Sequence, residues 1–309
     1  MGGLRGRDFL TVNDFTQAEL QELLDFALLL KKDWQEGKPQ LLLPGKTLGM
    51  IFQKASTRTR VSFEVGMVHL GGYALFLNAS DLQIGRGESI RDTARVLSRY
   101  LDGLMIRTFA HADALELAEH ADIPIINGLT DLLHPCQAMA DLLTIWEHKG
   151  RLQGLKLAYV GDGNNVAHSL LLACSKMGMH VAVASPRNYQ PQAEIVTQAL
   201  ENAKVHGSTV LVTTNPKAAV EDADIIYTDV WVSMGQEEER EKRLEIFKPY
   251  QVNADLVAEA AKDAVIMHCL PAHRGEEVTE DVLEGPQSVV FAQAENRLHM
   301  QKAILAKLL

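Results

Sequence analysis

The sequence has few of the features that mark a disulfide scaffold, a zinc ribbon or a membrane protein. Only three of its 309 residues are cysteines, Cys136, Cys174 and Cys269. Their spacing forms neither an even framework nor a C-x-x-C pair, which argues against disulfides and against a zinc ribbon. Apolar runs such as 41–43 stop within a few residues, well short of the roughly 20 that cross a bilayer. The amino-terminal segment lacks a signal-peptide core. We therefore expect a cytoplasmic protein with no membrane contact.

Basic residues are fewer than acidic ones. Lys and Arg number 30 against 40 Asp and Glu, and the formal net charge is −10. A protein that coats duplex nucleic acid needs a broad basic face, so we expect no nucleic-acid partner, although a local basic pocket is compatible with this balance. With 47% hydrophobic residues, 10 prolines and 22 glycines, the composition excludes disordered, collagen-like and coiled-coil proteins.

Short β-rich runs alternate with longer amphipathic segments, which is typical of βαβ units in an α/β protein. We expect two domains, each a parallel-sheet α/β sandwich, over residues 1–149 and 150–309. The last helix, about 293–309, is expected to return and pack on the first domain. A charged segment at 236–248 predicts a solvated helix face. The predicted strands are 47–52, 73–77, 104–107 and 123–126, then 155–160, 181–184, 209–212, 224–227 and 265–267.

Polar clusters follow several of these strands. The segment 56–60, Ser-Thr-Arg-Thr-Arg, comes directly after the first strand, where hydroxyls, guanidinium groups and helix N-terminal amides can hold an anion such as phosphate. Ligands of open α/β sheets bind outside the carboxyl ends of the strands, so we expect the clusters to share one cleft. Taken singly, the alternatives are a capping Ser or Thr, a structural His134, a turn residue at Asp229 and a buried apolar Cys269. The other clusters are Arg107, 134–137, Asn164 with Asn165, Asp229 with Ser233 and Met234, and 268–271.

Two cofactor interpretations are weak. The segment 160–166 resembles a dinucleotide fingerprint, but Val166 replaces its third glycine, and 185–187 offers no acid for a ribose. A metal site built from His134, Cys136, His268 and Cys269 lacks a familiar ligand spacing. We expect no metal and no cofactor.

Four motifs together resemble the aspartate/ornithine carbamoyltransferase family over nearly the whole chain. They are STRTR at 56–60, HPCQ at 134–137, DVWVSMG at 229–235 and HCLP at 268–271. The first two are shared with the aspartate branch and indicate the carbamoyl phosphate half only. The last two distinguish the ornithine branch.

The resemblance implies transfer of the carbamoyl group from carbamoyl phosphate to the δ-amine of L-ornithine, giving L-citrulline and phosphate. It also implies a homotrimer with sites at subunit interfaces, in which Gln83 reaches into a neighbouring subunit's site. Arg107, His134, Cys269 and Asp229 would be the catalytic residues. By the same resemblance, carbamoyl phosphate would be bound by Ser56, Thr57, Arg58, Thr59, Gln83, Arg107, His134, Gln137, Cys269, Leu270 and Arg297, and ornithine by Asn165, Asp229, Ser233 and Met234.

Some alternatives stay open on the sequence alone. The acceptor could be putrescine or aspartate instead of ornithine. Two other classes are a nicotinamide-dependent dehydrogenase and a non-catalytic binding paralogue. The segment 272–275, Ala-His-Arg-Gly, varies within the family and receives no role, and neither regulation nor the direction of the reaction in the cell can be read.

Overall fold

The computed structural model describes residues 3–84, 87–232 and 237–309, and this part of the chain divides into two compact units. Unit 1 comprises 1–143 and 295–309, and unit 2 comprises 144–294. Both unit boundaries fall inside helices, α5 (Pro135–Lys149) and α12 (Val290–Leu308). The final segment therefore belongs to the first unit, which confirms the expected return of the last helix.

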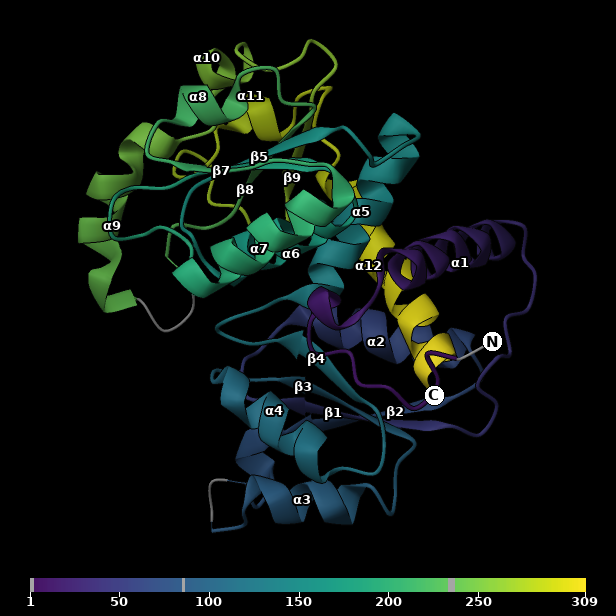
Figure 1. The fold of residues 1–309 in the computed structure, drawn as a ribbon. Helices are drawn as coiled ribbons and strands as arrows, with labels where there is room; N and C mark the ends of the chain where they lie inside the picture. The colour runs from purple at the N-terminus through teal and green to yellow at the C-terminus, as the bar shows by residue number, and fades with distance from the viewer. Residues whose placement is uncertain (1–2, 85–86, 233–236) are drawn as a thin grey trace. The chain divides into compact units, whose positions relative to one another are not determined.

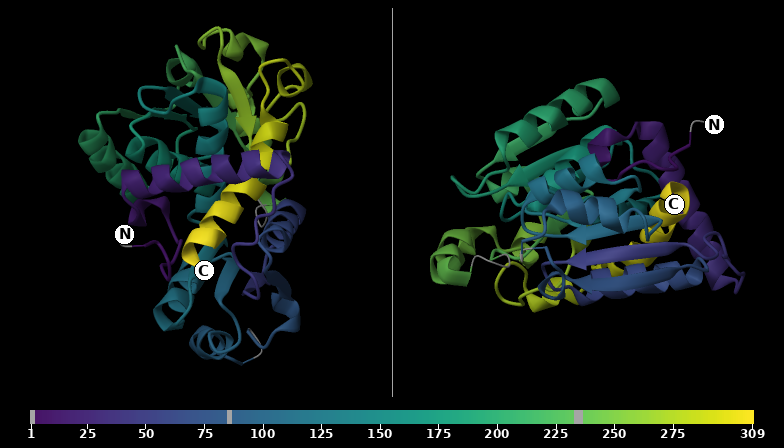
Figure 2. Two further views of the ribbon diagram at one scale, coloured as in Figure 1. Left: turned by 90° about the vertical axis from the view of Figure 1, so that its right-hand side faces the viewer. Right: turned by 90° about the horizontal axis from the view of Figure 1, so that it is seen from below.

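Unit 1 contains a parallel sheet with the strand order β2-β1-β3-β4. Helices α3 and α4 cover one face of it and α2 lies on the other (Figure 1), with Ala94, Ala114 and Leu117 packed against buried strand residues. In Figure 2, α1 (purple) crosses α12 (yellow), where Lys31 Nζ donates to Asn296 Oδ1 at 2.8 Å. The elements are η1 Val12–Asp14, α1 Gln17–Gln35, β1 Thr47–Phe52, α2 Thr57–His69, β2 Tyr73–Asn78, η2 Ala79–Asp81, α3 Ile90–Leu97, β3 Gly103–Arg107, α4 His111–His120 and β4 Ile125–Leu129.

Unit 2 contains a second parallel sheet, in the order β7-β6-β5-β8-β9. Helices α6 and α7 cover one face, and α8, α10 and α11 the other (Figure 1). The elements are β5 Lys156–Val160, α6 Asn165–Lys176, β6 His180–Ala184, α7 Ala193–His206, β7 Val210–Thr213, α8 Pro216–Val220, β8 Ile225–Thr228, η3 Glu237–Glu239, α9 Arg240–Phe247, η4 Lys248–Tyr250, α10 Ala254–Val257, β9 Val265–His268 and α11 Glu280–Leu283. Two parallel α/β units confirm the predicted fold class.

The predicted strands agree with the observed ones apart from their ends. The largest shift is in β4, which runs over Ile125–Leu129 and not over 123–126. Pro124 has no N–H to donate to a ladder, and the first N–H of β4 is bound outside the sheet by Asp8 Oδ1 at 2.8 Å.

Carboxylates hold the starts of the central strands. Asp102 Oδ2 accepts the N–H of Thr47, the first residue of β1, at 2.8 Å. Asp224 Oδ2 does the same for Lys156, the first residue of β5, also at 2.8 Å. Both bonds satisfy a backbone donor at the amino end of a strand, the end opposite the predicted binding residues.

The charged residues of the segment 238–248 are exposed, as predicted, with one exception. Arg243 on α9 is only 3% exposed. Its guanidinium forms an ion pair with Asp162, donates to the Trp231 carbonyl at 2.6 Å and lies 4.8 Å from the centre of the Tyr189 ring. Across the described ranges, none of the helices is both long and apolar enough to cross a membrane.

Candidate functional site

The start of α2 is organised for anion binding. Ser56 is the N-cap of this helix, and its Oγ accepts the N–H of Thr59 at 3.2 Å. Thr57 and Arg58 occupy the first turn, where backbone N–H groups have no helical partner and favour negative charge. The four predicted phosphate-binding residues of this motif therefore surround one helix N-terminus.

Arg297 on α12 joins three of the predicted residues of unit 1. Its Nη2 donates to Thr59 Oγ1 at 2.7 Å, and its Nη1 donates to Gln137 Oε1 and lies 3.4 Å from His134 Nε2. All four side chains are buried, none being more than 4% exposed. Gln137 is fixed at its other end, since its Nε2 donates to Asp141 Oδ1 at 2.8 Å. We call Thr59, His134, Gln137 and Arg297 the Arg297 cluster.

His134 is surrounded by cationic groups. Burial is the main cause that lowers its pKa well below the usual value, and the charges of Arg297, Arg107 and Arg58 lower it further. Arg107, at the end of β3, is 6% exposed. His134 is therefore a neutral imidazole at neutral pH, and it retains one ring N–H to donate. Three guanidinium groups near one neutral imidazole make this buried region positively charged, which favours the binding of an anion.

Sequence reasoning missed one residue near this place. Lys54 comes two residues before Ser56, and its Nζ lies 4.3 Å from the centre of the Phe109 ring. Burial and the neighbouring charge of Arg107 lower the Lys54 pKa. Its position next to the STRTR motif was the only signal available in the sequence.

Gln83 does not join the Arg297 cluster by any hydrogen bond described for residues 3–84, 87–232 and 237–309. It is exposed, in the segment between η2 and α3. Ser233 and Met234 lie outside the described residues.

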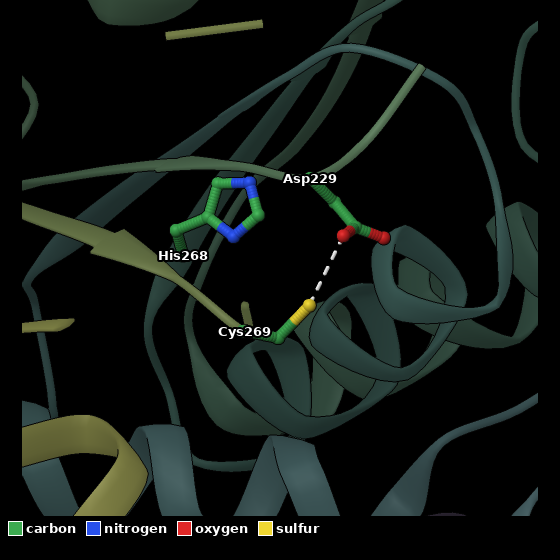
Figure 3. Close-up of side chains that lie close together, drawn as sticks. All are labelled: Asp229, His268 and Cys269. Carbon is green, nitrogen blue, oxygen red and sulfur yellow. Dashed lines mark hydrogen bonds between the residues drawn. The ribbon is translucent and has the colours of Figure 1, made fainter. Parts of the chain in front are cut away.

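In unit 2, Asp229 links two other polar residues at the carboxyl end of the sheet. Its Oδ1 accepts the Cys269 thiol at 3.0 Å (Figure 3), and its Oδ2 accepts Asn164 Nδ2–H at 2.8 Å. Asn164 also caps α6, because its Oδ1 accepts the N–H groups of Val166 and Ala167 at 2.9 and 3.2 Å. The predicted ligand Asn165 is the half-buried first residue of that helix. The contact with Asp229 is made by Asn164, the residue before the predicted ligand Asn165.

The neighbouring Tyr159 is a neutral phenol. Burial raises its pKa well above the usual value, and Asp229 adds to this effect. Its hydroxyl lies 3.4 Å from Asn164 Oδ1. Tyr159 is therefore a buried and uncharged neighbour of Asp229.

The glycine pattern after β5 has a packing explanation. A Cβ on Gly163 would lie 2.3 Å from the Pro191 backbone nitrogen, which is closer than real contacts allow. The Gly163 N–H donates to the Tyr189 carbonyl at 2.8 Å. Close approach of two backbone segments accounts for this glycine without a nucleotide.

Among the described residues, two groups of side chains have ligand atoms within 4.8 Å of one another, as a metal would need. The first is Asp229, His268 and Cys269. His268 Nδ1 already accepts the Leu270 N–H at 2.8 Å, and its Nε2 lies 3.1 Å from Glu277 Oε1, so a metal would have to displace one of these partners.

In the second group, Glu276 and Glu277 approach His273 Nδ1 at 3.7 and 3.8 Å. Both separations are longer than a hydrogen bond.

Two family models match consecutive parts of the chain. "Aspartate/ornithine carbamoyltransferase, carbamoyl-P binding domain" matches residues 7–147, and "Aspartate/ornithine carbamoyltransferase, Asp/Orn binding domain" matches 153–308. The chain belongs to the aspartate/ornithine carbamoyltransferase family. This confirms the resemblance read from the four motifs.

Members of this carbamoyltransferase family resemble the chain over its full length. The ornithine carbamoyltransferase of Anoxybacillus flavithermus is 60% identical over 306 residues, which is 99% of this chain and 98% of that protein. The "Ornithine carbamoyltransferase, anabolic" of Pyrococcus furiosus is 59% identical over 304 residues, 98% of this chain and 96% of that one.

Solved structures of the family agree with the fold. A structure titled ornithine carbamoyltransferase from Pyrococcus furiosus has a TM-score of 0.97 at 57% identity, covering 100% of this chain and 98% of that one. The anabolic ornithine carbamoyltransferase from Campylobacter jejuni has a TM-score of 0.91 at 40% identity, covering 97% of each.

Proposed function

We propose that the protein transfers the carbamoyl group of carbamoyl phosphate to the δ-amine of L-ornithine, giving L-citrulline and phosphate. The observation that carries this proposal is the Arg297 cluster, a buried set of donors beside the N-terminus of α2. Family membership and the names of the full-length relatives support it. Unit 1 would bind carbamoyl phosphate and unit 2 would bind ornithine.

Different residues of unit 1 would bind the phosphate and the carbamoyl group of carbamoyl phosphate. Ser56, Thr57 and Arg58 would hold the phosphate at the start of α2, where Arg58 neutralises the leaving group. Negative charge grows on the carbonyl oxygen in the tetrahedral transition state, so donors aimed there lower the barrier most. Arg107, neutral His134 and Thr59 would supply these donors. Gln137 and Arg297 would complete the contacts to the carbamoyl group.

The residues of unit 2 would orient ornithine. Asn165 and Asp229 would hold its α-amino and α-carboxylate groups together with Ser233 and Met234, two positions carried over from the DVWVSMG motif. Cys269 and Leu270 would lie beside the reacting amine. Asn164 enters this set because it fixes one carboxylate oxygen of Asp229.

The reacting amine must lose a proton before it attacks. Free ornithine carries this amine protonated at neutral pH. After the neutral amine attacks, its nitrogen must lose a second proton, and we propose that the leaving phosphate accepts this one, since both Asp229 oxygens already accept hydrogen bonds. In an Asp229→Asn variant, kcat should then keep the wild-type pH profile even if ornithine binds more weakly. Loss of one limb of that profile would identify Asp229 as the base.

We also propose that the protein is a homotrimer and that it is located in the cytoplasm. A homotrimer would let the exposed Gln83 reach the site of a neighbouring subunit. Cys136, Cys174 and Cys269 are not joined in disulfides, which suits the cytoplasm. Carbamoyl phosphate is already activated, so the reaction as proposed uses no cofactor. Two relatives are named anabolic, and we propose the same direction, towards arginine biosynthesis.

The deciding assay is citrulline formation from carbamoyl phosphate and ornithine, run beside aspartate and putrescine at equal concentration. Turnover with ornithine alone is the expected result. Turnover with putrescine would keep the carbamoyl phosphate residues in their roles and overturn the ornithine set. No turnover with any acceptor would overturn the proposed function.

A further inference from the structure

His268 lies at the end of β9 with its imidazole fully buried. Its backbone N–H donates to Gln293 Oε1 at 2.9 Å. Its ring nitrogens have partners on both sides, the Leu270 N–H at 2.8 Å on Nδ1 and Glu277 Oε1 at 3.1 Å on Nε2. Its backbone N–H and both of its ring nitrogens are therefore engaged by the protein.

These partners determine the form of the ring. A backbone N–H can only donate, so Nδ1 must be an unprotonated acceptor. The proton is then on Nε2, which donates it to the Glu277 carboxylate. His268 is thus a neutral imidazole in the Nε2–H form, and it could relay a proton only by breaking one of these two bonds.

Figure 3 shows how the ring lies relative to the Asp229 group. A hydrogen bond joins Cys269 to Asp229, and none is drawn from His268 to either of them. Instead His268 acts on the residue that follows Cys269. Cys269 is therefore held through its thiol by Asp229 and through the next peptide group by His268.

Leu270 needs such a partner because of its backbone. Its φ of +57° places it in the left-handed region, which is unfavourable for a residue with a side chain. A hydrogen bond to its N–H offsets part of that cost. Leu270 would otherwise relax towards the ordinary region and move its peptide group.

Glu277 holds the His268 ring through its hydrogen bond to Nε2. It is 0% exposed, and its Oε1 also accepts the His273 N–H at 2.6 Å. Its own carbonyl accepts the Val252 N–H at 2.8 Å. One carboxylate oxygen thus fixes both ends of the segment 268–273 and selects the Nε2–H form of His268.

We propose that His268 and Glu277 are a positioning pair that holds Cys269 and Leu270 in place for carbamoyl transfer, with His268 transferring no proton. This inference rests on the function proposed above. It also assigns a role to Glu277, which the motifs did not single out. A displacement of about 1 Å at a reacting group can lower a rate about 100-fold, so the pair should affect kcat more than substrate binding.

A matched pair of substitutions separates the two ring nitrogens. In His268→Asn the side-chain oxygen takes the place of Nδ1 and can still accept the Leu270 N–H. In His268→Gln the amide reaches the place of Nε2 and leaves the Leu270 N–H without its partner. Since either change alters the environment of the buried Glu277 carboxylate, both are also made together with Glu277→Gln, which can keep its two accepted bonds without the charge.

We expect His268→Asn to keep kcat within about 10-fold and His268→Gln to lose about 100-fold. Ornithine KM should change less than about 3-fold in both, because residues that act only through Leu270 do not touch its α-groups. The pH profile of kcat should not move in His268→Asn. Thermal melting shows whether each variant is folded. In the wild-type protein, ¹⁵N NMR of labelled histidine should show a neutral Nε2–H ring for the signal that His268→Asn removes.

Several results would overturn the inference. They are equal losses in the Asn and Gln variants, a pH profile that loses a limb in His268→Asn, or a protonated or Nδ1–H ring by NMR. The NMR arm decides the matter even if the Gln variant does not fold. Wild-type protein that forms no citrulline would reject the proposed function, whereas active wild type with unaffected Gln variants would reject only the positioning pair.

Discussion

Replacement of Arg297 by lysine should weaken carbamoyl phosphate binding without weakening ornithine binding. Arg297 uses two nitrogens of a planar fork to reach Thr59, Gln137 and His134 at the same time. A lysine ammonium carries its charge on one nitrogen. It can hydrogen-bond one of these three residues but cannot reproduce the planar arrangement of the guanidinium donors. One lost charge-assisted hydrogen bond is worth about 1.5 to 3 kcal/mol. At 1.4 kcal/mol per factor of ten, KM for carbamoyl phosphate should rise about 10- to 150-fold.

The assay measures both substrate constants in the same preparation and follows phosphate binding by calorimetry. Arg95→Lys is the control. The Arg95 side chain is 58% exposed, and its Nη1 lies 3.9 Å from Asp92 Oδ1. Such surface ion pairs contribute less than about 1 kcal/mol to stability. We expect the control to behave as wild type in both constants. An Arg297→Lys enzyme with raised ornithine KM and unchanged carbamoyl phosphate KM would refute the assignment of Arg297.

Three other predictions concern charge and stability. His134→Asn should lower kcat about 10²- to 10³-fold as a transition-state donor is lost. Because the folded-state pKa of His134 is lowered, the unfolded chain alone gains its proton below the usual pKa of about 6.5. The variant should therefore lose less stability than wild type between pH 7 and 5 in urea titrations, and an equal slope would contradict the neutral ring. For the buried Asp162 and Arg243 pair, Asp162→Asn should destabilise the fold by about 3 to 5 kcal/mol at pH 8, because an uncompensated buried guanidinium remains. Burial raises the Asp162 pKa from 3.8 to about 6. As pH falls through 6, the folded wild type therefore takes up a proton that its unfolded chain does not, which adds to its stability, and the difference between the two proteins should widen by pH 5. A constant difference would count against that assignment. Asp102→Asn should lower the melting temperature with kcat unchanged, because the Asp102 carboxylate binds Lys46 and Thr47 at the start of β1; a fall in kcat of the folded variant would contradict this.

The strands and their order along the chain could be predicted because both sheets are parallel. Strands covered on both faces form short, nearly continuous apolar runs, and the breaks between them are marked by turn residues. The polar residues at the carboxyl ends of these runs could be identified for the same reason. The apolar runs do not show at which residue each strand begins to pair with its neighbour. In β4, the proline at 124 places this start at Ile125.

Side-chain partners that are distant in sequence could not be predicted. Arg243 lies in a segment dominated by charge, and its burial depends on Asp162, which is 81 positions away. Glu277 is one of several neighbouring acids, and only the folded chain shows that it pairs with His268. Asn164 and Asn165 were recognised as a polar pair, but the sequence did not show that the Asn164 amide contacts Asp229. Such choices are set by side-chain direction, which spacing along the chain does not encode.

The carboxylates that hold the starts of β1 and β5 have a consequence for how such a protein can adapt. Asp102 and Asp224 act at the amino ends of their strands, while the residues proposed to bind substrates follow the carboxyl ends. Changes that suit the protein to a hotter or colder habitat can therefore accumulate at one edge of each sheet while selection preserves chemistry at the other. Thermal tolerance and substrate choice would then be inherited as separable traits of the same chain.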